Sequence, residues 1–265
     1  MFLIKAAKMY FQPAGLLRFA PYILIIPIVV FHALSLAGCV STSPAIPNIY
    51  AVALRANNNA TDTPLQVRIG YFGICGIDEE GTTCQTASGR SVEALAANLF
   101  PEILGNNKTS DSTRKTDKKE TSDISDLVTT ALDLQSRTFT PILAGAAVLF
   151  ILGLAALFLF KRDVGKGASW EHPRRSAIVR RTTYGMLCGS AALSFAAAIA
   201  TSQAAGALEY ASESMGHASV LIKSGTTLQV LQWTAFGFQS LFLLAVPFLV
   251  KNKTQAPEGE FKGEA

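Results

Sequence analysis

The sequence is poor in the side chains that carry enzymatic chemistry. Only three histidines stand among its 265 residues, and they are scattered. No serine or cysteine stands at a recognisable spacing from a base that could activate it as a nucleophile. Phosphate-binding glycine loops and zinc-ligand clusters are absent from the sequence as well. We therefore expect a protein that is not an enzyme and that holds neither a cofactor nor a metal.

Acidic and basic side chains are missing from four long stretches of the chain, Phe19–Val40, Phe139–Phe160, Thr182–Ala207 and Gly225–Val250. The shortest, of about 22 residues, would reach about 33 Å as a helix, and a bilayer core of about 30 Å needs about 20 apolar residues. The sequence therefore predicts a membrane protein of the all-α class with a four-helix transmembrane bundle. Because ionisable side chains inside spans usually mark ion paths, their absence argues against a proton-coupled transporter and against a channel acting alone.

Basic residues are distributed unevenly between the connecting segments. Residues 161–181 hold seven Lys and Arg against two acids, whereas residues 208–224 hold only Lys223. Basic residues collect on the cytosolic side of membranes, so this placement sets topology and does not indicate nucleic-acid binding. The expected order is a cytosolic N-terminus (1–18), four spans (19–40, 139–160, 182–207, 225–250), an outer loop after the first span (41–138), a basic cytosolic loop (161–181), a short outer loop (208–224) and a cytosolic tail (251–265).

Two further features agree with an outer location for residues 41–138. Asn59 and Asn107 each begin an Asn-x-Thr glycosylation triplet in this loop. Cys75 and Cys84 also lie there, where an oxidising compartment allows a disulfide. A third triplet, at Asn252, falls in the predicted cytosolic tail and should stay unmodified.

The other two cysteines fall in or beside the predicted spans. Cys188 lies inside the third span, where we interpret it as a small packing residue. Cys39 closes the first span in a Leu-Ala-Gly-Cys sequence that looks like a bacterial lipoprotein cleavage box. The alternative is a buried or interfacial thiol, which the length of the preceding apolar run favours, because signal-peptide cores are shorter.

The outer loop has a pattern of its own. Ile49–Leu54 and Leu65–Ile74 are β-branched or aromatic stretches separated by a polar turn, which predicts an antiparallel strand pair. Ser91 is expected to cap a short helix, because the apolar residues after it follow helical spacing, and Pro101 should kink or end that helix. The polar composition of residues 105–122 predicts a flexible insert. An amphipathic helix is expected from Asp123 onward.

The most informative motif of the loop is Gly70-Tyr71-Phe72-Gly73-Ile74-Cys75, followed by Cys84. Glycine weakens a strand unless the backbone bends or approaches another group closely. The two aromatic residues would alternate across the strand, one ring at the junction of sheet and membrane and the other outward. A disulfide closing a loop of about ten residues would contribute about 2.5–3 kcal/mol in the chain-entropy model.

This motif resembles the glycine–apolar–apolar–glycine–x–cysteine…cysteine signature of fungal claudin-like proteins. Within that group the chain most resembles the factor-induced-gene (Fig) family, described as calcium regulators and membrane-fusion proteins. Residues 43–50 and 67–73 look typical of it. The chain departs from animal claudins because no Trp stands within the motif, which makes a sealing role doubtful.

The resemblance implies a multi-pass plasma-membrane protein that regulates low-affinity calcium influx and fusion of mating or growing fungal cells. The motif residues Gly70, Tyr71, Phe72, Gly73, Cys75 and Cys84 would then be structural and not catalytic. Expected partners are membrane lipids and calcium-channel subunits or other membrane proteins. Two alternatives stay open: a scaffold that organises membrane domains without touching calcium, and a pore-forming subunit.

Several polar residues could have a role besides the motif. Asp78-Glu79-Glu80 could attract a cation or form a solvated turn. Glu209, Glu213 and His217 would share one face of a continued third helix, where they could bind a divalent ion or form an exposed outer face. His32, Gln203, Gln232 and Gln239 lie inside spans and are expected to form interhelical hydrogen bonds. Gly185 and Gly189 have GxxxG spacing, which predicts a packing face in the third span or, alternatively, a face for self-association.

Overall fold

The computed structural model describes residues 13–56, 65–78, 81–87, 89–101, 125–135, 142–165, 173–214 and 220–251. Several sequence predictions fall outside these residues. They are the three glycosylation triplets at Asn59, Asn107 and Asn252, the insert 105–122, the acids Glu79 and Glu80, and His217.

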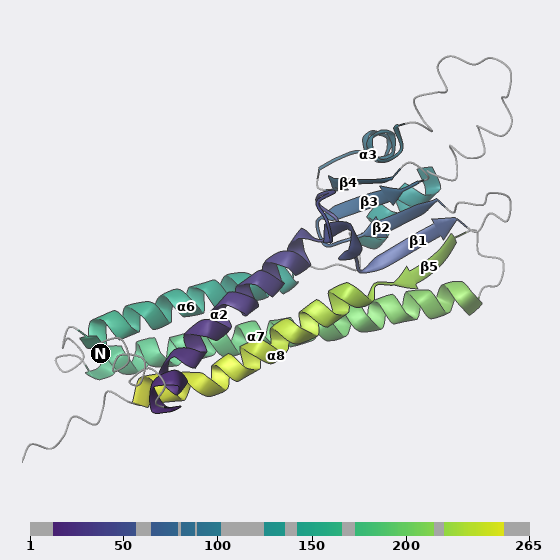
Figure 1. Ribbon diagram of the computed structural model, residues 1–265. Coiled ribbons are helices and arrows are strands. Elements are labelled where there is room, and N and C mark those ends of the chain that lie inside the picture. Colours follow the sequence, from purple (N-terminus) through teal and green to yellow (C-terminus); the bar gives the residue numbers. More distant parts are fainter. Residues whose placement is uncertain are drawn as a thin grey trace, which may run out of the picture.

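Four long helices lie side by side and leave the sheet at one end (Figure 1). They are α2 (Pro13–Ala37), α6 (Ile142–Gly165), α7 (Pro173–Ser214) and α8 (Thr226–Lys251). Helix α7 packs against both α6 and α8, and α2 packs against α8.

Three of these helices are long and apolar enough to cross a membrane, which makes the chain a membrane protein. The qualifying segments are Ile142–Arg162, Ala177–Ser214 and Thr226–Pro247. Helix α2 is apolar over the shorter stretch Pro21–Ala37. Its helix ends at Ala37, so Cys39 and Val40 fall outside the helix that was expected to run to residue 40.

Helix α7 is much longer than the span 182–207 expected from the sequence. Its 42 residues correspond to about 63 Å, roughly twice the thickness of a bilayer core. The segments 161–181 and 208–224, expected as loops, are therefore partly helical. The far end of α7 rises beside the sheet and packs against its last strand.

The sheet has five strands in the order β4-β3-β2-β1-β5, and each neighbouring pair is antiparallel. This is more than the predicted strand pair. The strands are β1 (Val52–Ala56), β2 (Gln66–Ile69), β3 (Gly73–Ile77), β4 (Thr82–Thr86) and β5 (Val220–Ser224).

Two expectations about the strands are corrected. Leu65–Ile74 was expected as one strand, but the chain turns at residues 70–72 and forms β2 and β3. Strand β5 comes from the short segment before α8, which carried no predicted strand, and it extends the sheet beyond β1.

One face of the sheet is covered by two short helices, α3 (Val92–Leu99) and the helix of residues 125–135. Ser91 caps α3 by accepting a hydrogen bond from the Ala94 amide at 3.3 Å, as its position predicted. The amphipathic pattern after Asp123 also forms a helix, as expected. The buried side chains of this layer are Leu95, Leu99, Leu127, Val128 and Ala131 on the helices, Phe100 directly after α3, and Leu54, Val67, Ile69 and Ile74 on the strands.

The core of the sheet continues into the helix bundle. Leu143, Ala205 and Leu228 belong to the same apolar cluster as the strand residues. A second cluster, formed by Ile28, Phe150, Leu187, Phe242 and Val246, lies between the long helices.

Strand β5 is tied to the extension of α7 by side-chain hydrogen bonds. The Glu209 carboxylate accepts hydrogen bonds from the Ser224 amide at 3.3 Å and from the Ser224 hydroxyl. The Ser212 hydroxyl accepts one from the Ile222 amide at 3.1 Å. These bonds satisfy backbone groups at the edge of the sheet, so the long α7 helix stabilises an edge strand that has a pairing partner on only one side.

We predict that Glu209→Ala loosens β5 without disturbing the rest of the sheet. Loss of the bond from the Ser224 amide should raise hydrogen exchange at residues 220–224 by on the order of tenfold. Hydrogen–deuterium exchange read by mass spectrometry measures this directly. Glu209→Gln is the matched control because it keeps a carbonyl acceptor, and equal exchange in both variants would contradict the assignment.

Candidate functional site

The Gly70–Gly73 segment, called the docking turn, joins β2 to β3 and places the sheet on the helices. Its backbone groups are held on several sides. The Gly70 amide donates to the Gly73 carbonyl at 2.8 Å, and the Phe72 carbonyl accepts from the Ala87 amide at 3.1 Å. The Gln135 side-chain amide donates to the carbonyls of Gly70 and Tyr71, both at 3.0 Å. The turn is therefore fixed by its neighbours and not by its own sequence alone.

The two glycines of the docking turn allow the chain that leaves α2 to pass very close. A Cβ atom at Gly70 would lie 2.2 Å from the Gly38 carbonyl oxygen, and one at Gly73 would lie 1.9 Å from the Cys39 carbonyl oxygen. Real Cβ atoms do not approach backbone atoms so closely. Both glycines are thus required by a backbone-to-backbone contact, which gives the physical reason for their place in the motif.

Tyr71 points from the docking turn into the helices. Its hydroxyl lies 3.0 Å from the Thr201 hydroxyl on α7 and accepts a hydrogen bond of 2.8 Å from the Gln232 side chain on α8. Burial raises the pKa of the Tyr71 hydroxyl, and these two hydrogen bonds oppose the shift. A tyrosine hydroxyl is protonated at neutral pH even without this shift, so it acts here as a neutral hydrogen-bonding group that links the turn to two helices.

Phe72 points away from this junction and is 44% exposed. One ring at the junction and one ring outward agrees with the sequence prediction. The cause differs, because the two residues occupy a turn and do not alternate along a strand.

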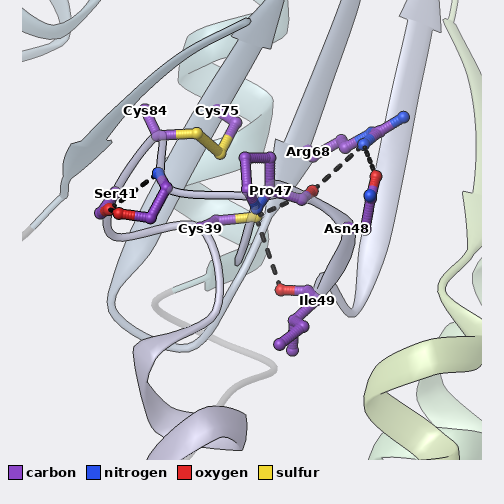
Figure 2. Close-up of a disulfide and its surroundings, with 9 residues drawn as sticks. Cys39, Ser41, Pro47, Asn48, Ile49, Arg68, Cys75 and Cys84 are labelled. Atoms are coloured by element: carbon purple, nitrogen blue, oxygen red, sulfur yellow. Dashed lines mark hydrogen bonds between the residues drawn. A yellow bond between two sulfur atoms is a disulfide. The ribbon is translucent and has the colours of Figure 1, made fainter. Parts of the chain in front are cut away.

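Cys75 and Cys84 form the disulfide that the sequence predicted. They are directly opposite each other on β3 and β4, with their Cα atoms 4.0 Å apart. The bond joins the edge strand β4 to its neighbour β3, with Cys39 and Ser41 in its surroundings (Figure 2). Cys75 is fully buried and Cys84 is half-buried, so the disulfide is shielded mainly on its β3 side.

Cys39 is a buried thiol, in agreement with the favoured alternative for this residue. Its sulfur lies 3.9 Å from the Pro47 carbonyl oxygen and 3.6 Å from the Ile49 carbonyl oxygen. Burial raises its pKa to about 12, opposed by the positive charge of Arg68. The neutral thiol is a poor nucleophile and serves as a packing group under the sheet.

Arg68 fixes the segment that enters β1, and the sequence did not mark it as a site residue. Its guanidinium donates to the Pro47 carbonyl at 3.1 Å and to the Asn48 side-chain oxygen at 2.8 Å (Figure 2). It also lies over the Tyr50 ring, 4.9 Å from the centroid. The alternation of β2 was a usable signal, because it places Arg68 on the face opposite the dry residues Val67 and Ile69.

Two of the four polar residues predicted to link helices do form such links. His32 on α2 lies 3.2 Å from the Ser194 hydroxyl on α7, and Gln239 on α8 donates to the Ser190 hydroxyl at 2.9 Å. Gln232 instead links α8 to Tyr71 of the docking turn, so its bond is not interhelical. The prediction for Gln203 is wrong: Gln203 is exposed on α7 and has no interhelical partner among the described residues.

The candidate cation sites do not come together in the described part of the chain. No cluster of three or more His, Cys, Asp or Glu side chains there could hold a metal ion. Asp78 accepts a hydrogen bond of 2.9 Å from the Gly81 amide, as expected of a solvated turn. Glu209 is engaged with Ser224, and Glu213 is exposed.

The GxxxG pair does not form one packing face. A Cβ at Gly189 would contact Leu149 of α6 at 3.8 Å, whereas nothing lies within 4 Å of a Cβ at Gly185. Gly189 therefore faces a neighbouring helix, and Gly185 is exposed.

We predict that Gly73→Ala destabilises the protein by about 1–3 kcal/mol, because the added methyl group must displace the Cys39 backbone. The midpoint temperature of thermal unfolding in detergent should fall, and so should the fraction of the protein delivered to the cell surface. Gly237→Ala is the control, since nothing lies within 4 Å of its Cβ position and alanine favours a helix. Equal behaviour of the two variants would show that the close contact does not matter.

We also predict that Tyr71→Phe costs about 1–3 kcal/mol, because Thr201 and Gln232 lose a buried partner. The unfolding midpoint of the purified protein reports this loss. Tyr210→Phe removes a hydroxyl from a side chain that is 75% exposed and should leave the midpoint unchanged. An unchanged midpoint in Tyr71→Phe would mean that the junction does not depend on the hydroxyl.

Comparison with known proteins gives the family. The family model described as "Ca2+ regulator and membrane fusion protein Fig1" matches residues 51–252, which include the whole docking turn, the disulfide and three of the long helices. A comparison with curated proteins finds no match. The family match confirms the resemblance seen in the motif. Because it spans well over half of the sequence, the chain belongs to the Fig1 family of Ca2+ regulators and membrane fusion proteins.

Proposed function

We propose that the protein is a plasma-membrane regulator of calcium influx and of membrane fusion during fungal mating or polarised growth. It acts through the disulfide-tied sheet on the outer side of the membrane. Membership of the Fig1 family supports calcium regulation and fusion. The single structural observation that carries the mechanism is the docking turn, which fixes the sheet to α7 and α8 through Tyr71.

The proposed topology has four spans and both termini in the cytosol. Helix α2 supplies the first span, since its residues 19–37 carry no charge and correspond to about 28 Å. The positive charge of residues 161–181 supports the cytosolic side for the end opposite the sheet. The sheet, the disulfide and the triplets at Asn59 and Asn107 then lie outside, where oxidation and glycosylation occur.

The mechanism proposed is accessory and not catalytic. The apolar cluster of Ile28, Phe150, Leu187, Phe242 and Val246 fills the space between the long helices, which favours a partner of a channel over a pore. A sheet held rigidly above the membrane can present the same surface continuously to a calcium-channel subunit or to an opposing membrane. The helices anchor this surface and set its height.

Calcium uptake in a deletion strain, measured with and without mating pheromone, tests the proposal. The wild-type gene should restore uptake and cell fusion. Cys75→Ser should restore neither fully, because loss of the crosslink removes about 2.5–3 kcal/mol and impairs surface delivery. Cys188→Ser is the matched control, since that cysteine is free and exposed on α7.

Two outcomes would contradict the proposal. Normal uptake in the deletion strain would favour a membrane-domain scaffold without a role in calcium transport. Ion flux through the purified protein in liposomes, with no partner present, would favour a pore-forming subunit.

A further inference from the structure

Exposed basic side chains collect at the end of the helices opposite the sheet. Lys161 and Arg162 stand near the end of α6, and Arg180 and Arg181 stand near the start of α7. We call these four residues the basic cluster. Each of them is exposed.

The packing of α6 against α7 brings the two pairs to a similar height. The Leu187 side chain of α7 lies against Gly153 of α6. Lys161 is eight residues beyond Gly153, about 12 Å along its helix, and Arg180 is seven residues before Leu187, about 10.5 Å along its antiparallel neighbour. The four charges therefore lie at a similar height at the same end of the α6–α7 pair.

Helix α2 also contacts the basic cluster, through Tyr22. The Lys161 ammonium donates to the Tyr22 hydroxyl at 2.6 Å and lies 4.7 Å from the centre of the Tyr22 ring. This contact holds one cation of the cluster in place and leaves its other N–H donors available. Arg162, Arg180 and Arg181 contribute further charge without a carboxylate partner among the described residues.

The charge of this end differs from that of the sheet end. Within residues 142–165 and 173–200 the acidic residues number one, Asp163, which follows Arg162 in the sequence, so the four bases of the cluster exceed the acids at this end. At the sheet end acids outnumber bases among the described side chains, with Asp78, Glu93, Asp126, Asp133, Glu209 and Glu213 against Arg55, Arg68, Arg90 and Lys223. An anionic ligand is thus favoured at the basic cluster in particular.

Exposed apolar side chains lie directly beside these charges. Phe158 and Leu159 on α6 are 68% and 55% exposed, and Ile178 on α7 is 63% exposed. A ligand that satisfies both features carries a negative group next to a hydrocarbon chain. A nucleic acid or an acidic peptide would use the charges and leave the apolar side chains uncovered.

We propose that the basic cluster is a binding site for anionic phospholipids, with the headgroup phosphate on Arg162, Arg180 and Arg181 and the acyl chains along Phe158, Leu159 and Ile178. Arginine suits this role because its planar guanidinium can donate two parallel hydrogen bonds to one phosphate. Lysine and arginine beside a membrane attract anionic lipids over the distance of the Debye length. The proposal does not depend on the calcium function.

The test uses the purified full-length protein in nanodiscs that contain phosphatidylcholine and a minor fraction of phosphatidylserine. Lipids retained by the protein after mild extraction are counted by native mass spectrometry. The wild type should retain phosphatidylserine in excess over its share of the nanodisc. The double variant Arg180→Gln/Arg181→Gln should lower this enrichment by on the order of tenfold.

Two matched variants make the result specific. Arg180→Lys/Arg181→Lys keeps the charges and should keep most of the enrichment. Arg55→Gln/Lys223→Gln removes two exposed bases at the sheet end and should keep all of it. Circular dichroism of each variant confirms that the helices are intact, and the single variant Arg180→Gln replaces the double variant if that one does not fold.

Several results would overturn the proposal. Wild-type protein that retains phosphatidylserine only in proportion to its share would do so, as would a glutamine variant with undiminished enrichment. Soluble glycerophosphoserine that displaces the lipid at an equal concentration would show that the cluster recognises a free phosphate compound and not a membrane lipid.

Discussion

The close passage of two backbones at the base of the sheet is the constraint on which the other contacts depend. The chain leaving α2 lies against the docking turn so tightly that neither Gly70 nor Gly73 can carry a side chain. This contact places Tyr71 at the end of the helices next to the sheet, where its hydroxyl forms hydrogen bonds with Thr201 and Gln232. It also brings Cys39 under the sheet near the disulfide. The motif is therefore a set of residues that serve one joint between the sheet and the helices.

The features that could be predicted from sequence are those with a local signal. Long stretches without charge predicted the apolar helices α6, α7 and α8, because burying a charge in a bilayer is costly at any position. The disulfide followed from two cysteines that lie in one predicted outer loop. The amphipathic helix after Asp123 and the cap at Ser91 followed from helical spacing and from the chemistry of a helix N-terminus.

The features that were missed depend on contacts between distant segments. Strand β5 pairs with β1, about 170 residues earlier in the chain, and its five residues carry no turn that would mark a hairpin. The break between β2 and β3 has a local signal in Gly70 and Gly73, but glycine also occurs within bent strands, so the signal does not distinguish a turn from a strand. The hydrogen bonds of Tyr71 and Gln135 could not be predicted, because they depend on how the sheet docks. The prediction for Gln203 was wrong for a geometric reason. Gln203 comes two residues after the buried Thr201, which is a rotation of about 200° around α7, so its side chain lies on the opposite side of the helix.

The length of α7 links the two ends of the molecule. One continuous helix carries Arg180 and Arg181 at one end and the Glu209 and Ser212 side chains that hold β5 at the other. A rod of this kind cannot tilt at one end alone. Membranes of different thickness change the tilt of long apolar helices. The orientation of the sheet above the surface is consequently tied to the thickness of the bilayer, and a locally thinned or curved membrane would turn it.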